Sequence, residues 1–222
     1  MTDRQEGLIL VNVDTLADRD PKNNFLKRAL TFNPGGLLDG AENLTIAGNL
    51  VYIACDRGLV IVDFGEPLKP KVLSILSSVV KPTSIVVQFR YAFVTDREGL
   101  KVVDVTHPGE PRLVATLAIS EARSVYVART YAYVAAGSQG LVIVDVERPE
   151  HPRVDQIFNA GGSLNDARDV KIGSTNVSLF AYVADGKNGL RVLQLTSPET
   201  TPGYLGFSPR PAPQLEIGRA HV

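Results

Sequence analysis

Short apolar runs recur along this chain at a spacing of about 41 residues. The run GLVIVD stands at Gly58–Asp63 and again at Gly140–Asp145, and the near-copy GLKVVD lies between them at Gly99–Asp104. Two more divergent copies begin at Gly7 and Gly189. Self-similarity at a fixed period of this length is the sequence signature of a repeat architecture.

Each repeat contains several short runs rich in Val, Ile and Tyr, separated by Gly, Pro or polar turns. Residues 123–158 show this most clearly, as RSVYVAR, YAYVAAGSQ, GLVIVDVERPEH and PRVDQIF. Such runs favour strands, and no window carries an apolar stripe at helical spacing. Runs such as LVIV are apolar at consecutive positions, so both faces of the sheet are expected to be buried. The pattern therefore predicts an all-β fold, a β-propeller of four-stranded antiparallel blades. An open solenoid is the alternative.

The repeat spacing predicts an incomplete propeller of about four and a half blades. Because residues 1–8 parallel the end of a second strand at 94–100, the natural protein is expected to start further upstream, and a signal segment would then lie outside this sequence. The C-terminal EIGRAHV resembles a translated sequencing adapter. The expected boundaries are residues 1–42 (two outer strands and a long loop), 43–81, 82–122, 123–167 (with a second long loop), 168–208, 209–215 (a truncated continuation) and 216–222 (a non-native tail).

The motif GLVIVD, preceded by the Tyr-rich strand YAYVAAG and followed by a proline-bearing turn, resembles the LVIVD repeat family. Leu59–Asp63 and Leu141–Asp145 reproduce the motif, whereas the outer copies LILVN and LRVLQ depart from it. Members are bacterial and archaeal proteins, often surface-associated, whose repeats are taken to form β-propellers. The resemblance implies a part of a larger surface or secreted protein, in the cell envelope or outside the cell. It brings no catalytic residues.

Composition excludes several classes of function. The 222 residues carry 23 basic and 24 acidic side chains and a net charge of −1, so no nucleic-acid partner is expected. No apolar run approaches the roughly 18 residues of a membrane helix. The single cysteine, Cys55, cannot form a disulfide within the chain.

The recurring aspartates that end the GLVIVD runs have two interpretations. Asp63, Asp104 and Asp145 can accept hydrogen bonds from nearby turn amides, as aspartates in turns commonly do. A ladder of metal ligands is the alternative, but we expect no metal site. His107 and His151 occupy different places in the repeat, away from the expected axis.

Two long segments break the repeat in the same way. Asn33–Ile46 (NPGGLLDGAENLTI) and Asn159–Ile172 (NAGGSLNDARDVKI) align without gaps, and both join an outer strand to the next inner strand. They are therefore expected to project from one face, and loops on rigid scaffolds often bind ligands. Alternatively, Asn-x-Gly-Gly is only a shared turn. The candidate binding residues in these loops are Asn33, Gly35, Gly36, Asn159, Gly161 and Gly162.

Two arginines lie where inner strands are expected to begin. Arg123 and Arg168 could pair with Asp166 and Asp169, or they could engage an anionic group of a ligand or partner. We therefore add Arg123, Asp166 and Arg168 to the candidate binding residues.

The sequence favours a non-catalytic interaction module that binds a protein or carbohydrate partner and packs against further blades of its parent chain. The alternative is a fragment of a propeller hydrolase or lyase with a metal on the central axis. That alternative requires several Glu, His or Asp ligands at the inner strand ends, and the sequence does not supply them. We expect no catalytic residue and no cofactor.

Overall fold

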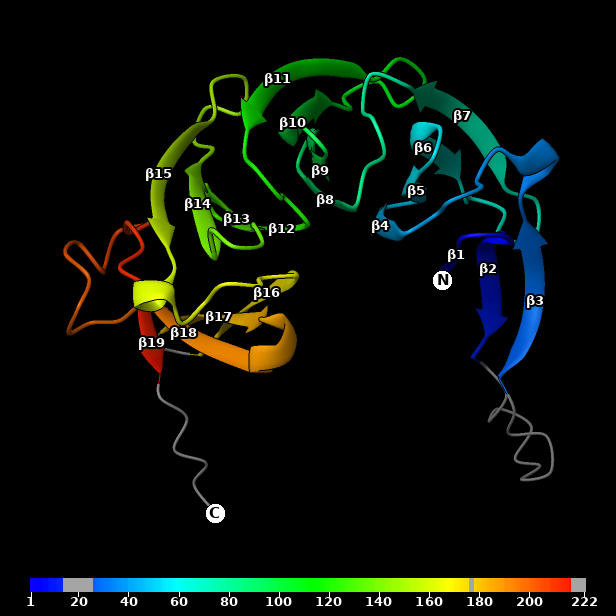
Figure 1. Ribbon diagram of the computed structural model, residues 1–222. Helices are drawn as coiled ribbons and strands as arrows, with labels where there is room; N and C mark the ends of the chain where they lie inside the picture. Colours follow the sequence, from blue (N-terminus) through cyan, green and yellow to red (C-terminus); the bar gives the residue numbers. More distant parts are fainter. Residues whose placement is uncertain (14–25, 176–177, 217–222) are drawn as a thin grey trace. The chain divides into compact units, whose positions relative to one another are not determined.

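The computed structural model describes residues 1–13, 26–175 and 178–216, and Figure 1 shows a succession of β-sheets. Two compact units are present, Met1–Ala92 with Asp104–Arg112 and Phe93–Val103 with Leu113–Val222. In the described ranges the helical elements are three single 3-10 turns, η1 (Pro34–Gly36), η2 (Ala160–Gly162) and η3 (Gly186–Asn188). None of them could cross a membrane.

The first unit contains a three-stranded and a four-stranded sheet, each antiparallel throughout. The first has the order β1-β2-β3, with β1 (Thr2–Asp3), β2 (Gly7–Asn12) and β3 (Lys27–Phe32). The second has the order β4-β5-β6-β7, with β4 (Asn43–Ala47), β5 (Leu50–Cys55), β6 (Gly58–Asp63) and β7 (Lys71–Leu76).

The second unit contains two complete antiparallel sheets. One has the order β12-β13-β14-β15, with β12 (Ser124–Ala128), β13 (Tyr131–Ala135), β14 (Leu141–Asp145) and β15 (Arg153–Phe158). The other has the order β16-β17-β18-β19, with β16 (Asp169–Ser174), β17 (Leu179–Ala184), β18 (Leu190–Thr196) and β19 (Gln214–Glu216). The remaining four-stranded sheet comprises β8 (Ser84–Gln88), β9 (Tyr91–Asp96), β10 (Gly99–Asp104) and β11 (Arg112–Ala118).

The prediction of an all-β fold with four-stranded antiparallel sheets is confirmed, and the LVIVD motif is the third strand of its sheet. Strand β6 is buried from Gly58 to Val62, so side chains on both of its faces are covered, as the consecutive apolar positions indicated. The aspartates of the motif act as turn acceptors. Their carboxylates accept the backbone N–H two residues on, at 2.8 Å for Asp63 and Asp104 and 2.9 Å for Asp145.

A β-bulge recurs at one place in the repeat, where the third strand pairs with the fourth. The register shifts between Leu10 and Val11, between Ile61 and Val62, and between Ile143 and Val144. Bulges increase the local twist and disrupt the ladder beside an outer strand, which makes that edge a poorer template for another chain.

Each unit has its own apolar core between successive sheets. In the first unit Leu8 of β2 and Leu38 of the loop between β3 and β4 pack against β5 and β6. In the second unit Tyr133 and Leu141 pack against Val183 of β17 and Leu193 of β18. These faces bury mostly Val, Ile, Leu and Tyr, which drive the sheets together.

The last sheet differs from the expected boundary at residue 208, because its fourth strand is Gln214–Glu216. Residues 197–213 form turns and bends instead of a strand. That segment contains five prolines, which lack the N–H that a sheet ladder needs. Of the segment expected to be a non-native tail, Glu216 pairs with Val192 through its backbone, and residues 217–222 lie outside the described residues.

Candidate functional site

The two long loops share the conformation of their glycine turn and bury an equivalent leucine. Gly35 (φ 59°, ψ 29°) and Gly161 (φ 64°, ψ 28°) sit in left-handed conformation at equivalent places in η1 and η2. Three residues further on, Leu38 and Leu164 are completely buried. The shared Asn-x-Gly-Gly-x-Leu sequence therefore makes a turn that delivers a leucine into a core.

The candidate residues of these loops lie in turn positions. Asn33 accepts the backbone N–H of Leu38 through Oδ1 at 2.8 Å, and Asn159 accepts the N–H of Leu164 through its backbone carbonyl at 3.0 Å. The following pairs of glycines, Gly35 with Gly36 and Gly161 with Gly162, all have positive φ. Because the loops belong to different units, each is a separate candidate surface.

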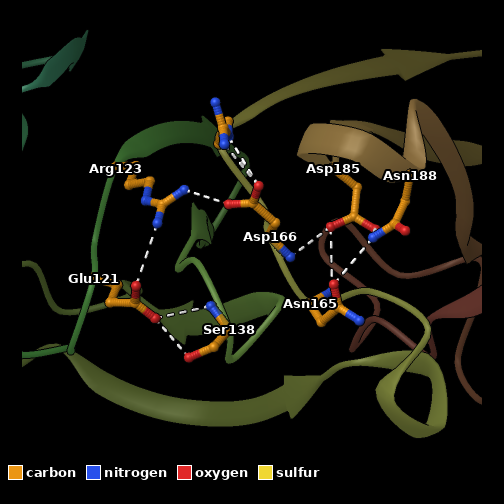
Figure 2. A network of polar contacts seen from close by, with 8 residues as sticks. Glu121, Arg123, Ser138, Asn165, Asp166, Asp185 and Asn188 are labelled. Carbon is orange, nitrogen blue, oxygen red and sulfur yellow. Dashed lines mark hydrogen bonds and ion pairs between the residues drawn. The ribbon is translucent and has the colours of Figure 1, made fainter.

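In the second unit, side chains from two segments form a continuous charged chain of Glu121, Arg123, Asp166 and Arg168. Figure 2 labels the first three of these residues. Arg123 donates through Nη1 to Asp166 Oδ1 at 2.7 Å and through Nη2 to Glu121 Oε1 at 3.2 Å. Arg168 donates to Asp166 Oδ2 through Nη2 at 2.8 Å and Nε at 3.1 Å. The structure thus brings together three candidate residues, Arg123, Asp166 and Arg168.

The carboxylates of this chain are held in their charged form. Hydrogen bonds from Arg168 and then Arg123 lower the pKa of Asp166 below its ordinary value. Hydrogen bonds from the hydroxyl and backbone N–H of Ser138 are the largest cause of the lowered pKa of Glu121. A hydrogen bond to the charged form of an acid favours that form.

Asp185 holds the loop before β16 through hydrogen bonds to its backbone. Its side chain is fully buried, and its Oδ1 accepts the backbone N–H groups of Asn165 at 3.1 Å and Asp166 at 2.7 Å. Its Oδ2 accepts a hydrogen bond from Asn188 Nδ2 at 2.9 Å (Figure 2). The same oxygen lies 3.6 Å from Arg191 Nε. A buried carboxylate with several donors holds the backbone of residues 165–166 in one place.

Asp169 is not a partner of the two arginines. Burial raises its pKa, but hydrogen bonds from Ser124 and Lys171 outweigh burial and hold the pKa below the ordinary value. Lys171 Nζ lies 2.9 Å from Asp169 Oδ1. Both arginines therefore pair with Asp166, as expected. Asp169, the other expected partner, pairs with Lys171 instead.

Five residues of the network were not among the candidates from the sequence: Glu121, Ser138, Asn165, Asp185 and Asn188. Asp185 stands before the Gly-Leu pair as Asp3 and Asp96 do, which marked it as an acceptor of backbone amides. Asp3 and Asp96 accept amides of their own hairpin, however, whereas Asp185 accepts those of the loop before β16. Among the residues that the structure describes, no three His, Cys, Asp or Glu side chains gather to hold a metal. Cys55 is buried, and burial raises the pKa of its thiol.

Comparison of the sequence with protein families gives one match. The family model described as the LVIVD repeat matches residues 40–75, 81–118, 120–159 and 166–200, which together are more than half of the chain. No curated protein matches the sequence.

Three solved structures share the fold at low sequence identity. A Bacteroides uniformis protein provisionally named a 6-phosphogluconolactonase has a TM-score of 0.65 at 14% identity, with 96% of this chain and 65% of that one covered. A Desulfotomaculum acetoxidans protein of unknown function has a TM-score of 0.57 at 15% identity, with 72% and 53% covered. A chain of a nidogen/laminin complex has a TM-score of 0.51 at 14% identity, with 78% and 66% covered.

The chain thus spans between about half and two thirds of the length of these proteins. Together with the repeated four-stranded sheets, these likenesses identify the fold as that of a β-propeller.

Proposed function

We propose that this chain, which belongs to the LVIVD repeat family, is a non-catalytic binding module that contacts another protein through the charged chain of Glu121, Arg123, Asp166 and Arg168. The observation that carries the proposal is the arrangement of these charges. Signs alternate along the chain, and each charge is held by a neighbour of opposite sign.

Exposure of the four side chains suits recognition of a partner. The side chains of Arg168 and Glu121 are 62% and 44% exposed, while Asp166 between the arginines is 28% exposed. The ends of the chain can therefore reach a partner while the middle keeps the geometry fixed. Preordered charges give an interface its specificity, and arginine is enriched at such interfaces.

The partner is proposed to be a protein, and the place of action the cell envelope or the outside of the cell. Support comes from membership of a family that is often surface-associated, and from the fold shared with a chain of the nidogen/laminin complex. Carbohydrate is the competing partner class.

Selection of binding peptides from a phage-displayed library tests whether the charged chain is a contact surface for a protein partner. Peptides should be enriched on the wild-type chain and lose binding to the Arg123→Ala/Arg168→Ala variant at an unchanged melting temperature, because exposed ion pairs contribute little to stability. Arg153→Ala is the matched control, since Arg153 is an exposed arginine paired with Asp145 in the same unit. Peptides that bind the double variant as well as the wild type would refute the charged chain as the contact surface.

The second candidate is a hydrolase or lyase, favoured by the likeness to the Bacteroides uniformis protein over 96% of this chain. An assay for hydrolysis of 6-phosphogluconolactone by the purified chain, with and without added divalent cations, distinguishes the two. Turnover above the uncatalysed rate would favour the enzyme.

A further inference from the structure

In the second unit, the sheets β12–β15 and β16–β19 present equivalent faces, of which only the first is covered. Strand register makes Tyr133 equivalent to Tyr182, and Leu141 equivalent to Leu190, because each leucine pairs with an alanine two positions beyond the tyrosine. Tyr133 and Leu141 are 1% and 0% exposed, whereas Tyr182 and Leu190 are 41% and 66% exposed. The same apolar residue types are thus buried on one sheet and open on the next.

The first face is covered by the next sheet, through Val183 and Leu193, and at its hairpin edge by a leucine followed two residues later by an aspartate. Leu164 lies in the same buried cluster as Tyr133 and Leu141, and a Cβ added to Gly140 would lie 3.1 Å from the Leu164 carbonyl oxygen. Asp166 then accepts the hydrogen bond from Arg123. Leu164 and Asp166 therefore supply one apolar and one anionic contact to this edge of the sheet.

Arg168 occupies on the second sheet the place that Arg123 occupies on the first. Each arginine stands one residue before the first strand and pairs with the carboxylate two residues earlier, Glu121 or Asp166. Arg123 uses its Nη1 for the carboxylate of the next sheet's loop. In the part of the chain that the structure describes, Nη1 of Arg168 donates to no carboxylate.

A hollow of about 550 Å³ lies where the second face lacks its cover. Its lining includes Arg168, Ala184, Gly189 and Leu190. These are the equivalents of Arg123, Ala135, Gly140 and Leu141 on the covered sheet. A Cβ added to Gly189 would meet no atom within 4 Å, so the space over this hairpin is open.

We infer that this hollow binds a Leu-x-Asp segment, carried by the Asn-x-Gly-Gly-x-Leu-x-Asp loop of a further LVIVD repeat. The leucine of that loop packs on Leu190 and Ala184, and its aspartate accepts a hydrogen bond from Arg168. Buried apolar area and one charge-assisted hydrogen bond provide the affinity. The site extends beyond the proposed function, since Leu190 lies outside the charged chain.

The two long loops of this chain provide matched probes. Fluorescently labelled peptides of residues 159–172 and 33–46 share the leucine, but Asp166 of the first corresponds to Gly40 of the second. Titrated with the full chain and followed by anisotropy, the 159–172 peptide should bind about tenfold more tightly than the 33–46 peptide, because it adds a hydrogen bond between charged groups. An Asp166→Asn change in the peptide should remove most of this advantage.

Variants of the chain locate the binding site. Leu190→Glu should abolish binding of the 159–172 peptide, and Leu205→Glu, at a leucine that is 97% exposed and outside the hollow, should leave it unchanged. Arg168→Ala should make the Asp and Asn peptides bind equally. Equal affinity of the 159–172 and 33–46 peptides, no saturable binding of either, or unchanged binding to Leu190→Glu would overturn the inference. Arg123→Ala removes a member of the charged chain that does not line the hollow, so it should leave binding of the 159–172 peptide unchanged, and failure of this inference is separable from failure of the proposed function.

Discussion

The loops Asn33–Ile46 and Asn159–Ile172 share a glycine turn and a buried leucine but arrange their charges in opposite ways. In the first, a Cβ on Gly40 would lie 2.3 Å from Cγ of Asp56, which stands in the neighbouring hairpin. In the second, a Cβ on Gly186 of the hairpin would lie 1.9 Å from Oδ2 of Asp166, which stands in the loop. Each repeat thus puts one carboxylate beside one glycine. In the first repeat the glycine is in the loop and the carboxylate in the hairpin, and in the second repeat the two are exchanged.

This exchange distinguishes the residues that build the loop from the charged residues that are available to contact a partner. The shared asparagine, glycines and leucine build the turn and fill the core in both loops. A carboxylate on the loop, as in Asp166, reaches Arg123 and Arg168, and the first loop has Gly40 and Glu42 at the positions of Asp166 and Arg168. The lesson is that a shared motif marks structure, and the positions that differ between its copies are candidates for function.

The largest expected effect is on the residue that the loops share. Leu38→Ala and Leu164→Ala should each lower the free energy of unfolding by about 3 kcal/mol, because each removes a fully buried leucine and leaves a cavity. Urea denaturation checks both. If one variant lost stability and the other did not, the two leucines would not be equivalent elements of the fold.

A smaller loss is expected at the glycine against which Asp166 packs. Gly186→Ala should cost about 2 kcal/mol of unfolding free energy, since φ is +51° and the added Cβ displaces the Asp166 carboxylate. Gly161→Ala is the control, because its φ is also positive (+64°) but nothing lies within 4 Å of the added Cβ. It should cost only about 1 kcal/mol. Equal losses, measured by thermal denaturation, would show that the carboxylate adjusts freely.

The smallest effect is a difference in acid stability. The pKa of Asp166 is lower than its ordinary value of 3.8, so this group stabilises the folded state above about pH 4. Its contribution is lost as the pH falls below 3.8 and through the lowered pKa. The unfolding free energy of the wild type should therefore fall more steeply than that of Asp166→Asn between pH 4 and pH 2. Parallel curves would contradict a lowered pKa.

Much of the fold was readable because strands with both faces buried leave a strong pattern. The runs at Gly58–Asp63 and Leu141–Asp145 became β6 and β14, and their aspartates became turn acceptors as predicted. The fourth strand at Gln214–Glu216 could not be read from a period, because a proline-rich excursion separates it from β18. The β-bulges between the third and fourth strands could not be predicted from the sequence either, because they depend on how the strands pair.

The candidate site was only partly readable. Charge and position beside an inner strand pointed to Arg123, Asp166 and Arg168, but which carboxylate meets which arginine depends on loop geometry. Glu121 and Ser138 are distant from Asp166 in sequence and join its network only through the packing of successive segments.

The most direct test of the account is an exchange of loop segments. Replacing Ser163–Arg168 (SLNDAR) by the sequence of Leu37–Glu42 (LLDGAE) keeps the leucine and removes Asp166 and Arg168. The affinity of this variant for a peptide selected on the wild type should be measured beside its melting temperature. We predict a melting temperature within a few degrees of the wild type and a loss of peptide binding of at least tenfold, because the exchange removes the Asp166 carboxylate and puts a glutamate in the place of Arg168. Retained peptide binding by a folded variant would contradict the account.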